Sequence, residues 1–206
     1  MEHLANLFKL VELTRSQPQT GYALSGIPTD ELSNLAEHHY LVTFFAWQLA
    51  RSANQGGAKL NIEKVLEHAL VHDLGEIFGG DIATPYALAN PRAKRLAKAF
   101  EQENQRFLKK YFGKDGKHFQ NLTSEIMNAK TDEGLVAKLA DYVECTQFKL
   151  FVRGLNKRDI EIAKLKCYGY IKKMKDPSAR KHLSKFVDLW IKELPKRDAL
   201  DIINPV

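Results

Sequence analysis

Apolar residues recur three and four positions apart along most of this chain, and that spacing places them on one face of an α-helix. The pattern is clear from Leu4 to Val11 near the N-terminus and again from Leu183 to Trp190 near the C-terminus. No segment shows an alternation of apolar and polar residues that outcompetes the helical spacing, so strands are not expected. The sequence therefore predicts an all-α fold.

Capping residues, prolines and glycines divide this pattern into eight predicted helices. Asn34 and Glu37 have the spacing of a capping box, and Gly79–Gly80 and Gly154 suit helix ends. Residues 81–91 are expected to form a loop. The predicted helices cover residues 2–15, 34–52, 62–78, 92–112, 122–129, 132–154, 159–175 and 178–194.

At 206 residues, of which 44% are hydrophobic, the chain suits one globular domain over residues 1–206, completed by the helices of residues 159–194. Two cysteines, Cys145 and Cys167, without C-x-x-C spacing indicate reduced thiols in an intracellular protein. No signal-peptide pattern is seen, and no apolar run approaches the roughly 20 residues that cross a bilayer. We therefore expect a cytoplasmic protein without a membrane span.

The formal net charge of +6 comes from lysines that are spread along the chain and interleaved with acids. This distribution is typical of a solvated surface and not of the basic stripe that binds nucleic acid. A positive field does raise the local concentration of an anionic substrate such as a phosphate ester. We therefore expect a small anionic substrate and no nucleic-acid partner.

The segment Val71–Glu76 places metal-ligand and proton-transfer chemistry in a stretch that is otherwise apolar. On a continuous helix, Glu76 lies one turn after His72, and Asp73 stands about 100° around the axis from His72. Asp81 follows directly after a double glycine. An imidazole and two carboxylates are thus predicted to share one broad helix face.

Two histidines and two aspartates, His38, His72, Asp73 and Asp141, lie in apolar stretches of three different predicted helices. Burial of an ionised carboxylate is costly unless a cation compensates it, and no Lys or Arg stands on these core faces. Two imidazoles and two carboxylates suit one divalent ion: Mn, Co, Fe, Ni or Zn and, less well, Mg. A lone core histidine is usually just hydrogen-bonded, but the adjacent pair His72 and Asp73 favours a metal site.

Two further histidines have a simpler interpretation. His39 lies about 100° around the helix from His38 and is expected to support the site or face another helix. His68 precedes His72 by one turn, and we expect it to have a supporting or packing role.

Four local strings resemble the motifs of HD-domain phosphohydrolases, and the branch they resemble most is that of the bacterial 5'-deoxynucleotidases and their HD-domain-containing relatives. The strings are Ala36–His38, Ala69–Glu76, Gly80–Pro85 and Ala137–Asp141, in the order H, HD, E, GD and D. The resemblance spans roughly residues 20–151. It implies an HD-domain helical bundle with hydrolase activity.

The resemblance also implies roles for individual residues. One divalent metal ion is expected to bind His38, His72, Asp73 and Asp141. Glu76 is expected to orient the attacking water or take its proton, which is general-base chemistry. Asp81 is expected to contact the substrate or assist proton transfer, and Thr84 to donate a hydrogen bond to a sugar or phosphate oxygen.

One loop departs from the family pattern. Members of the branch usually carry an arginine just before a tryptophan, and often a second arginine, ahead of the first motif. Here Gln19 and Ser25 stand at those positions, and Tyr22 stands where tryptophan is common. Gln19 and Tyr22 are therefore predicted substrate contacts. Without the arginines, either Arg15, Lys138 or another basic residue binds the phosphate, or the protein acts on a different substrate.

The predicted function is metal-dependent removal of phosphate from a small phosphomonoester, with a (deoxy)ribonucleoside 5'-monophosphate as the first choice. Two alternatives stay open: a phosphodiesterase or nuclease of the same superfamily, which would need a continuous basic groove, and a non-catalytic nucleotide-binding module. The resemblance also implies a homodimer. Tyr170, Phe186 and Trp190 are candidate interface residues, although core packing explains such residues more often.

Overall fold

The computed structural model describes residues 1–194, and α-helices and short 3-10 turns make up the regular structure of this part of the chain. The described residues contain no β-strand, and one isolated bridge joins Pro18 to Asn34. The predicted all-α fold is therefore confirmed. None of the helices described is long and apolar enough to span a lipid bilayer.

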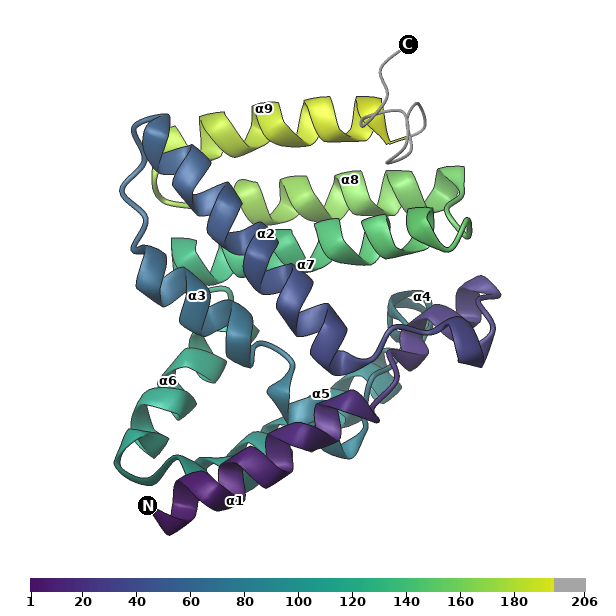
Figure 1. The fold of residues 1–206 in the computed structure, drawn as a ribbon. Helices are drawn as coiled ribbons and strands as arrows, with labels where there is room; N and C mark the ends of the chain where they lie inside the picture. The colour runs from purple at the N-terminus through teal and green to yellow at the C-terminus, as the bar shows by residue number, and fades with distance from the viewer. Residues whose placement is uncertain (195–206) are drawn as a thin grey trace, which may run out of the picture.

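Five helices pack around the middle of the molecule. α2 (Leu35–Gln55) crosses α7 (Asp132–Phe151), and α3 (Ile62–Val71) contacts both. α8 (Lys157–Ile171) packs on α7, and α9 (Pro177–Glu193) packs on α8, so these three helices form successive layers (Figure 1).

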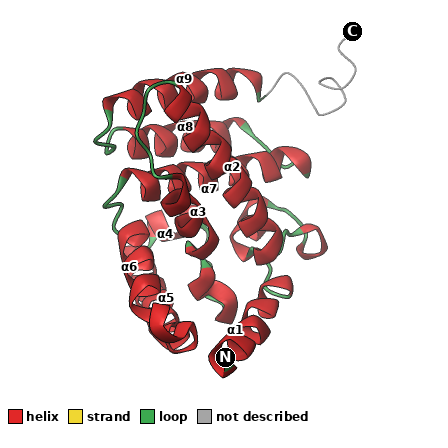
Figure 2. Ribbon diagram, turned by 60° about the vertical axis from the view of Figure 1, so that its left-hand side comes forward, coloured by secondary structure: helices red, strands yellow, loops and turns green. Residues whose placement is uncertain are grey.

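The remaining helices lie at the other end of the molecule. Figure 2 shows α1 (Glu2–Val11) on one side of this end, and α5 (Pro91–Leu108) and α6 (Gly116–Met127) on the other. A short helix, α4 (Thr84–Ala89), contacts α5. It lies within the segment 81–91 that was predicted to be a loop.

Two hydrophobic clusters hold the helices together. The larger one draws buried residues from α2, α3, α7, α8 and α9, with Leu139 and Leu183 fully buried in it. The smaller one includes Leu35 and Phe119. Burial of each such side chain contributes about 1.5–3 kcal/mol relative to exposure. The larger cluster therefore holds α2, α3 and α7 in place, and these helices either carry or directly precede the candidate ligands.

The predicted continuous helix over residues 62–78 is wrong. α3 ends two residues before Asp73, whose backbone is no longer helical (φ −117°, ψ 18°), and a 3-10 turn follows over Leu74–Phe78. Asn104 of α5 donates a hydrogen bond to the Gly75 carbonyl at 2.8 Å. A residue from another helix thus stabilises the break, and the two halves of the motif do not share one helical face.

Core packing accounts for the aromatic residues that were candidates for a dimer interface. Trp190 is buried in the larger cluster, and Phe186 and Tyr170 pack against it. The homodimer therefore stays a prediction without support from these side chains. Cys145 and Cys167 are not joined by a disulfide.

Candidate metal centre and adjoining cavities

A capping box fixes the start of α2 and with it the position of His38. The Asn34 side chain accepts a hydrogen bond from the Glu37 N–H at 3.0 Å, and the Glu37 carboxylate accepts one from the Asn34 N–H at 3.4 Å. Both bonds satisfy backbone donors that the helix itself leaves free. His38 lies just inside this start, is 1% exposed and contacts α7.

The other three candidate ligands come from the end of α3 and the middle of α7. Donor atoms of His38, His72, Asp73 and Asp141 all lie within 4.8 Å of one another. The Nε2 atoms of the two histidines are 3.1 Å apart, and Asp73 Oδ2 lies 3.3 Å from His72 Nε2. Asp141 Oδ1 lies 3.6 Å from His38 Nε2. The fold therefore brings the four predicted ligands together.

Hydrogen bonds prepare both imidazoles for a metal ion. His72 Nδ1 bonds to the Ala69 carbonyl at 2.8 Å, and because a carbonyl only accepts, Nδ1 carries the hydrogen and Nε2 of the neutral ring keeps its lone pair. Glu144 accepts a hydrogen bond from His38 Nδ1 at 2.6 Å. Histidines that bind metals commonly donate their other N–H to such oxygens. Together with two carboxylates, these rings form a donor set that could hold one divalent ion.

The electrostatics of this cluster also favour a bound positive charge. Burial lowers the pKa of His38, but hydrogen bonds with Asp73 and Glu144 raise it well above its ordinary value. Burial alone would raise the pKa of Asp73, yet His72 and His38 hold it below its usual range. Asp73 is therefore ionised in this cluster. Its negative charge is balanced either by a protonated His38 or by a divalent ion.

Glu144 was not anticipated from the sequence. It lies three residues after Asp141 on α7, and its side chain is 2% exposed. The available signal was an acidic residue on a helix face that also carries the buried Ala137 and Ala140, close to a predicted ligand. Because helical residues three apart share a face, this spacing points Glu144 toward the same centre.

The two additional histidines pack as expected. His39 is buried with its ring centroid 4.9 Å from that of His72, and burial together with His72 lowers its pKa to about 3. His68 donates from Nδ1 to the Lys64 carbonyl at 2.7 Å, and its Nε2 lies 3.3 Å from the Glu125 carboxylate. His39 therefore supports the centre as an uncharged ring, and His68 has a packing role between α3 and α6.

A cavity of about 450 Å³ opens onto the centre and is lined by three of the four candidate ligands and by Glu76. Burial raises the pKa of Glu76 well above its ordinary value, and the carboxylates of Asp73, Asp81 and Glu101 raise it further. Glu76 reaches this cavity from the 3-10 turn after α3. An acid with a raised pKa beside a candidate metal centre is suited to proton transfer.

Asp81 follows two glycines with positive φ, Gly79 at 92° and Gly80 at 112°, a backbone that other residues rarely adopt. Its carboxylate accepts a hydrogen bond from the Gly21 N–H, and Thr20 Oγ1 donates to the Asp81 carbonyl at 3.3 Å. These hydrogen bonds of Asp81 connect the loop after the two glycines to the segment that carries Gln19 and Tyr22, the predicted substrate contacts.

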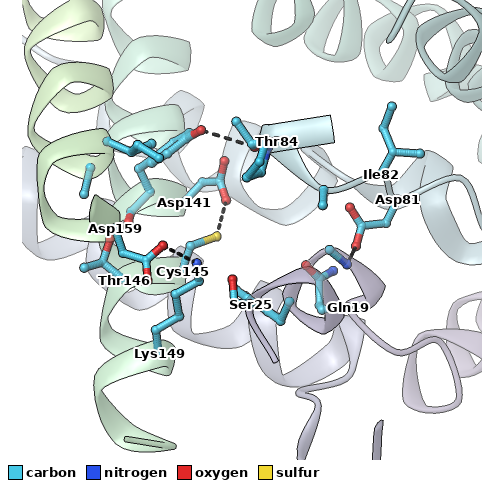
Figure 3. A pocket seen from close by; sticks show the side chains of 17 residues that line it. Gln19, Ser25, Asp81, Ile82, Thr84, Asp141, Cys145, Thr146, Lys149 and Asp159 are labelled. Atoms are coloured by element: carbon cyan, nitrogen blue, oxygen red, sulfur yellow. Dashed lines mark hydrogen bonds and ion pairs between the residues drawn. The ribbon is translucent and has the colours of Figure 1, made fainter. Parts of the chain in front are cut away.

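A second cavity of about 170 Å³ adjoins the first, and Figure 3 shows Asp141 and Cys145 facing Asp81 and Gln19 across it. Ser25 also lines it, and the Thr84 hydroxyl, 3.4 Å from the Tyr142 hydroxyl, lies between the two cavities. All four predicted substrate-binding residues line this smaller cavity: Gln19, Tyr22, Asp81 and Thr84.

The bases named as replacements for the missing arginines have different surroundings. Arg15 forms an exposed ion pair with Glu12 at 2.7 Å and lines neither cavity, whereas Lys138 lines the larger one. The lysine of the smaller cavity, Lys149, is paired with Asp159 at 2.7 Å. The smaller cavity therefore offers little free positive charge.

A family model described as "HD domain" matches residues 11–182, a range that holds the four candidate ligands, Glu76 and Asp81. The chain belongs to the HD domain family. The motif resemblance is thereby confirmed at the level of the family. Within this HD domain, α2, the segment after α3, and α7 bring the H, HD and D positions to one centre.

Two curated relatives of this HD domain are the 5'-deoxynucleotidases of Yersinia pestis (strain Pestoides F) and Yersinia pseudotuberculosis (serotype O:3, strain YPIII). Each is 30% identical to it over 119 residues, which cover 55% of this chain and 60% of the relative. The HD domain therefore spans about 60% of the length of the curated relatives it matches.

Two solved structures resemble this HD domain over most of their length. The PH0347 protein from Pyrococcus horikoshii OT3 has a TM-score of 0.68 and 22% identity, covering 91% of this chain and 98% of its own. A conserved hypothetical protein from Pyrococcus furiosus has a TM-score of 0.65 and 21% identity, covering 94% of this chain and 99% of its own. At these identities the likeness shows a common fold.

Proposed function

We propose that this HD domain is a metal-dependent phosphohydrolase that removes phosphate from a small phosphomonoester. The observation that carries the proposal is the convergence of two imidazoles and two carboxylates within 4.8 Å, beside Glu76 and an open cavity. Nucleoside 5'-monophosphates, deoxy or ribo, are the first substrates to test, because the Yersinia relatives are named 5'-deoxynucleotidase.

One divalent ion, Mn, Co, Fe, Ni, Zn or Mg, would be held by His38, His72, Asp73 and Asp141. When bound, such an ion offsets the negative charge that develops on the phosphoryl oxygens. The hydrogen bonds from Nδ1 of both imidazoles hold the rings with Nε2 toward the centre. These bonds restrict ring rotation before any ion or substrate arrives.

Glu76 is the proposed general base. Burial and the neighbouring Asp73 raise the pKa of Glu76, which makes its carboxylate a better proton acceptor than an ordinary exposed glutamate. Glu76 takes the proton of the attacking water while the water oxygen bonds to phosphorus. The bond between phosphorus and the leaving oxygen then breaks, and the leaving group departs as an alcohol once that oxygen is protonated.

Asp81 and Thr84 are proposed to act on the leaving-group side. Burial raises the pKa of Asp81 above its ordinary value, although the hydrogen bond from Gly21 lowers it. Asp81 either contacts the sugar or assists the proton transfer to the leaving oxygen. The Thr84 hydroxyl lines the same wall and is available to donate to a sugar or phosphate oxygen.

The smaller cavity is proposed to bind the uncharged part of the substrate. Gln19 supplies an amide, and Tyr22 supplies a buried ring that packs on Phe148 with 4.6 Å between centroids. The remaining wall is largely apolar, and the charge of its one lysine is paired. A nucleoside meets these requirements, since it combines a flat ring with hydrogen-bonding groups.

We further propose that residues 1–206 form a single HD domain, because α8 and α9 share the larger hydrophobic cluster with α2 and α7. Residues 195–206 lie outside the described part of the chain. A cytoplasmic location and a homodimer are predictions from the sequence and from the family resemblance, respectively.

The proposed function is tested by phosphate release from nucleoside 5'-monophosphates and other phosphomonoesters with Mn²⁺, Co²⁺ or Mg²⁺. Removal of a general base typically costs about 10²–10⁴-fold in rate, so Glu76→Gln should lose at least about 100-fold in kcat. Glu63→Gln, an exposed acid on α3, is the matched control and should keep wild-type rates. Nucleotide binding without phosphate release would support a binding module instead, and faster cleavage of diesters than of monoesters would support a phosphodiesterase.

A further inference from the structure

Four lysines that are dispersed in the sequence come together in the larger cavity. Lys94 and Lys98 stand one turn apart on α5, Lys138 belongs to α7, and Lys166 belongs to α8. Three helices therefore contribute four lysines to the lining of the cavity that opens onto the candidate metal centre.

These lysines have no acidic partner at ion-pair distance among residues 1–194. Lys166 instead has its ammonium 5.6 Å from the centroid of the Tyr142 ring. Lys149 in the smaller cavity differs in this respect, because it forms an ion pair with Asp159.

The charges of other lysines act on Lys166. Burial lowers the pKa of Lys166, and Lys94, Lys138 and Lys173 lower it further. The cavity also contains Glu101, whose pKa burial and Asp73 raise to about 7, so this acid offsets only part of the lysine charge at neutral pH. Like charges held close together favour the binding of an anion.

The larger cavity holds more lysines than one scissile phosphate has negative charges. Asp73 and Asp141 balance the two charges of a divalent ion, and a phosphomonoester brings at most two negative charges. The four lysines outnumber these two negative charges, and Glu76 and Glu101 offset part of the difference, in a cavity more than twice as large as the one proposed for the nucleoside. Space and charge are thus both available for a second anionic group.

We propose that the larger cavity is an anion subsite in which Lys94, Lys98, Lys138 and Lys166 bind a second phosphate of the substrate. The preferred substrate is then a phosphomonoester that carries another phosphate group, such as a nucleoside bisphosphate. The assignment to a substrate rests on the proposed function. The anion subsite itself does not, because its lysines are in place whether or not hydrolysis occurs.

The subsite is tested first by calorimetric titration of inorganic pyrophosphate into the metal-free, full-length protein. The variant Lys94→Gln with Lys98→Gln removes two charges from α5. Its matched control, Lys181→Gln with Lys185→Gln, removes two charges that are also one turn apart and exposed, on α9. Because the α5 variant lacks two ammonium groups that would bind the anion, its Kd for pyrophosphate should be at least about 10-fold weaker.

The control variant should change the pyrophosphate Kd by less than about 2-fold, since its lysines are outside the cavity. Equal weakening of pyrophosphate binding in the two variants would show that only the net charge of the protein matters, and it would overturn the subsite. Absence of pyrophosphate binding to the wild-type protein would overturn it as well. Circular dichroism of both variants checks that the helices are intact.

A second comparison uses the metal-loaded protein and separates this inference from the proposed function. The α5 variant should lower kcat/KM for a nucleoside 3',5'-bisphosphate at least about 10-fold more than for the nucleoside 5'-monophosphate, mainly through KM. Equal losses on both substrates would contradict the second-phosphate assignment. Lysine-dependent pyrophosphate binding without hydrolysis of any monoester would leave the subsite standing and contradict the phosphohydrolase.

Discussion

Glu144 accepts a hydrogen bond of 2.6 Å from Nδ1 of His38, and both side chains are buried. With one nitrogen of the ring held in this way, the other faces Nε2 of His72 at 3.1 Å. Glu144 touches no proposed substrate position, yet it sets the direction in which the first candidate ligand presents its lone pair. We therefore regard it as a positioning residue.

Replacement of Glu144 should weaken metal binding in two steps. Glu144→Gln keeps an acceptor for His38 Nδ1 but removes the charge, and Glu144→Leu removes both. Loss of such an outer hydrogen bond typically costs about 10–100-fold in metal affinity, so calorimetry with Mn²⁺ should give the order wild type, Gln, Leu. A purely structural role would lower the free energy of unfolding in both variants without this graded change in Kd.

The two glycines before Asp81 should differ in their tolerance of a side chain. Both have positive φ, and a rarely adopted backbone conformation costs about 1–3 kcal/mol. A Cβ at Gly79 meets open space, whereas a Cβ at Gly80 would lie 2.9 Å from the Phe100 ring. Urea unfolding should therefore show a larger loss for Gly80→Ala than for Gly79→Ala. Equal losses would mean that the Phe100 ring moves aside freely.

Asp176 should make stability depend on acid pH. Its carboxylate accepts hydrogen bonds from the backbone N–H groups of Lys59, Ala179 and Ser178, which lower its pKa in the folded protein. A group whose folded pKa is below its unfolded value, about 3.9 for Asp, stabilises the fold above that value. This stabilisation is lost as the pH falls through the folded pKa.

The difference in free energy of unfolding between wild type and Asp176→Asn should therefore be largest near neutral pH and shrink below about pH 4. Asparagine keeps an acceptor at the start of α9, so the comparison isolates the charge. The control is Asp115→Asn, at the start of α6, because Asp115 makes no side-chain cap hydrogen bond. A difference in free energy of unfolding that stays constant down to pH 2 would show that the charge of Asp176 contributes nothing to stability.

The all-α fold and the long helices α2 and α7 were predictable because their apolar spacing is a local property of the sequence. The convergence of His38, His72, Asp73 and Asp141 was predictable from chemistry, since buried acids next to histidines need a common cation. Neither inference required knowledge of how the helices pack.

The remaining features depend on contacts between helices. α3 ends before Asp73, and Asn104 of α5 donates a hydrogen bond to the Gly75 carbonyl in the turn that follows. The local sequence around Gly75 does not indicate this partner. Glu144 looks like an ordinary polar helix residue until α2 brings His38 against it. The lysine cavity was interpreted as dispersed surface charge for the same reason, because only the complete fold brings residues of α5, α7 and α8 to the same cavity.

The central claim is that His38, His72, Asp73 and Asp141 bind one divalent ion. Titration of Mn²⁺ into the metal-free protein, followed by calorimetry, tests it directly. We predict one equivalent bound per chain in the wild type and none in Asp73→Asn, with the helical circular dichroism of both proteins unchanged. Equal binding of Mn²⁺ by Asp73→Asn and wild type would contradict the claim.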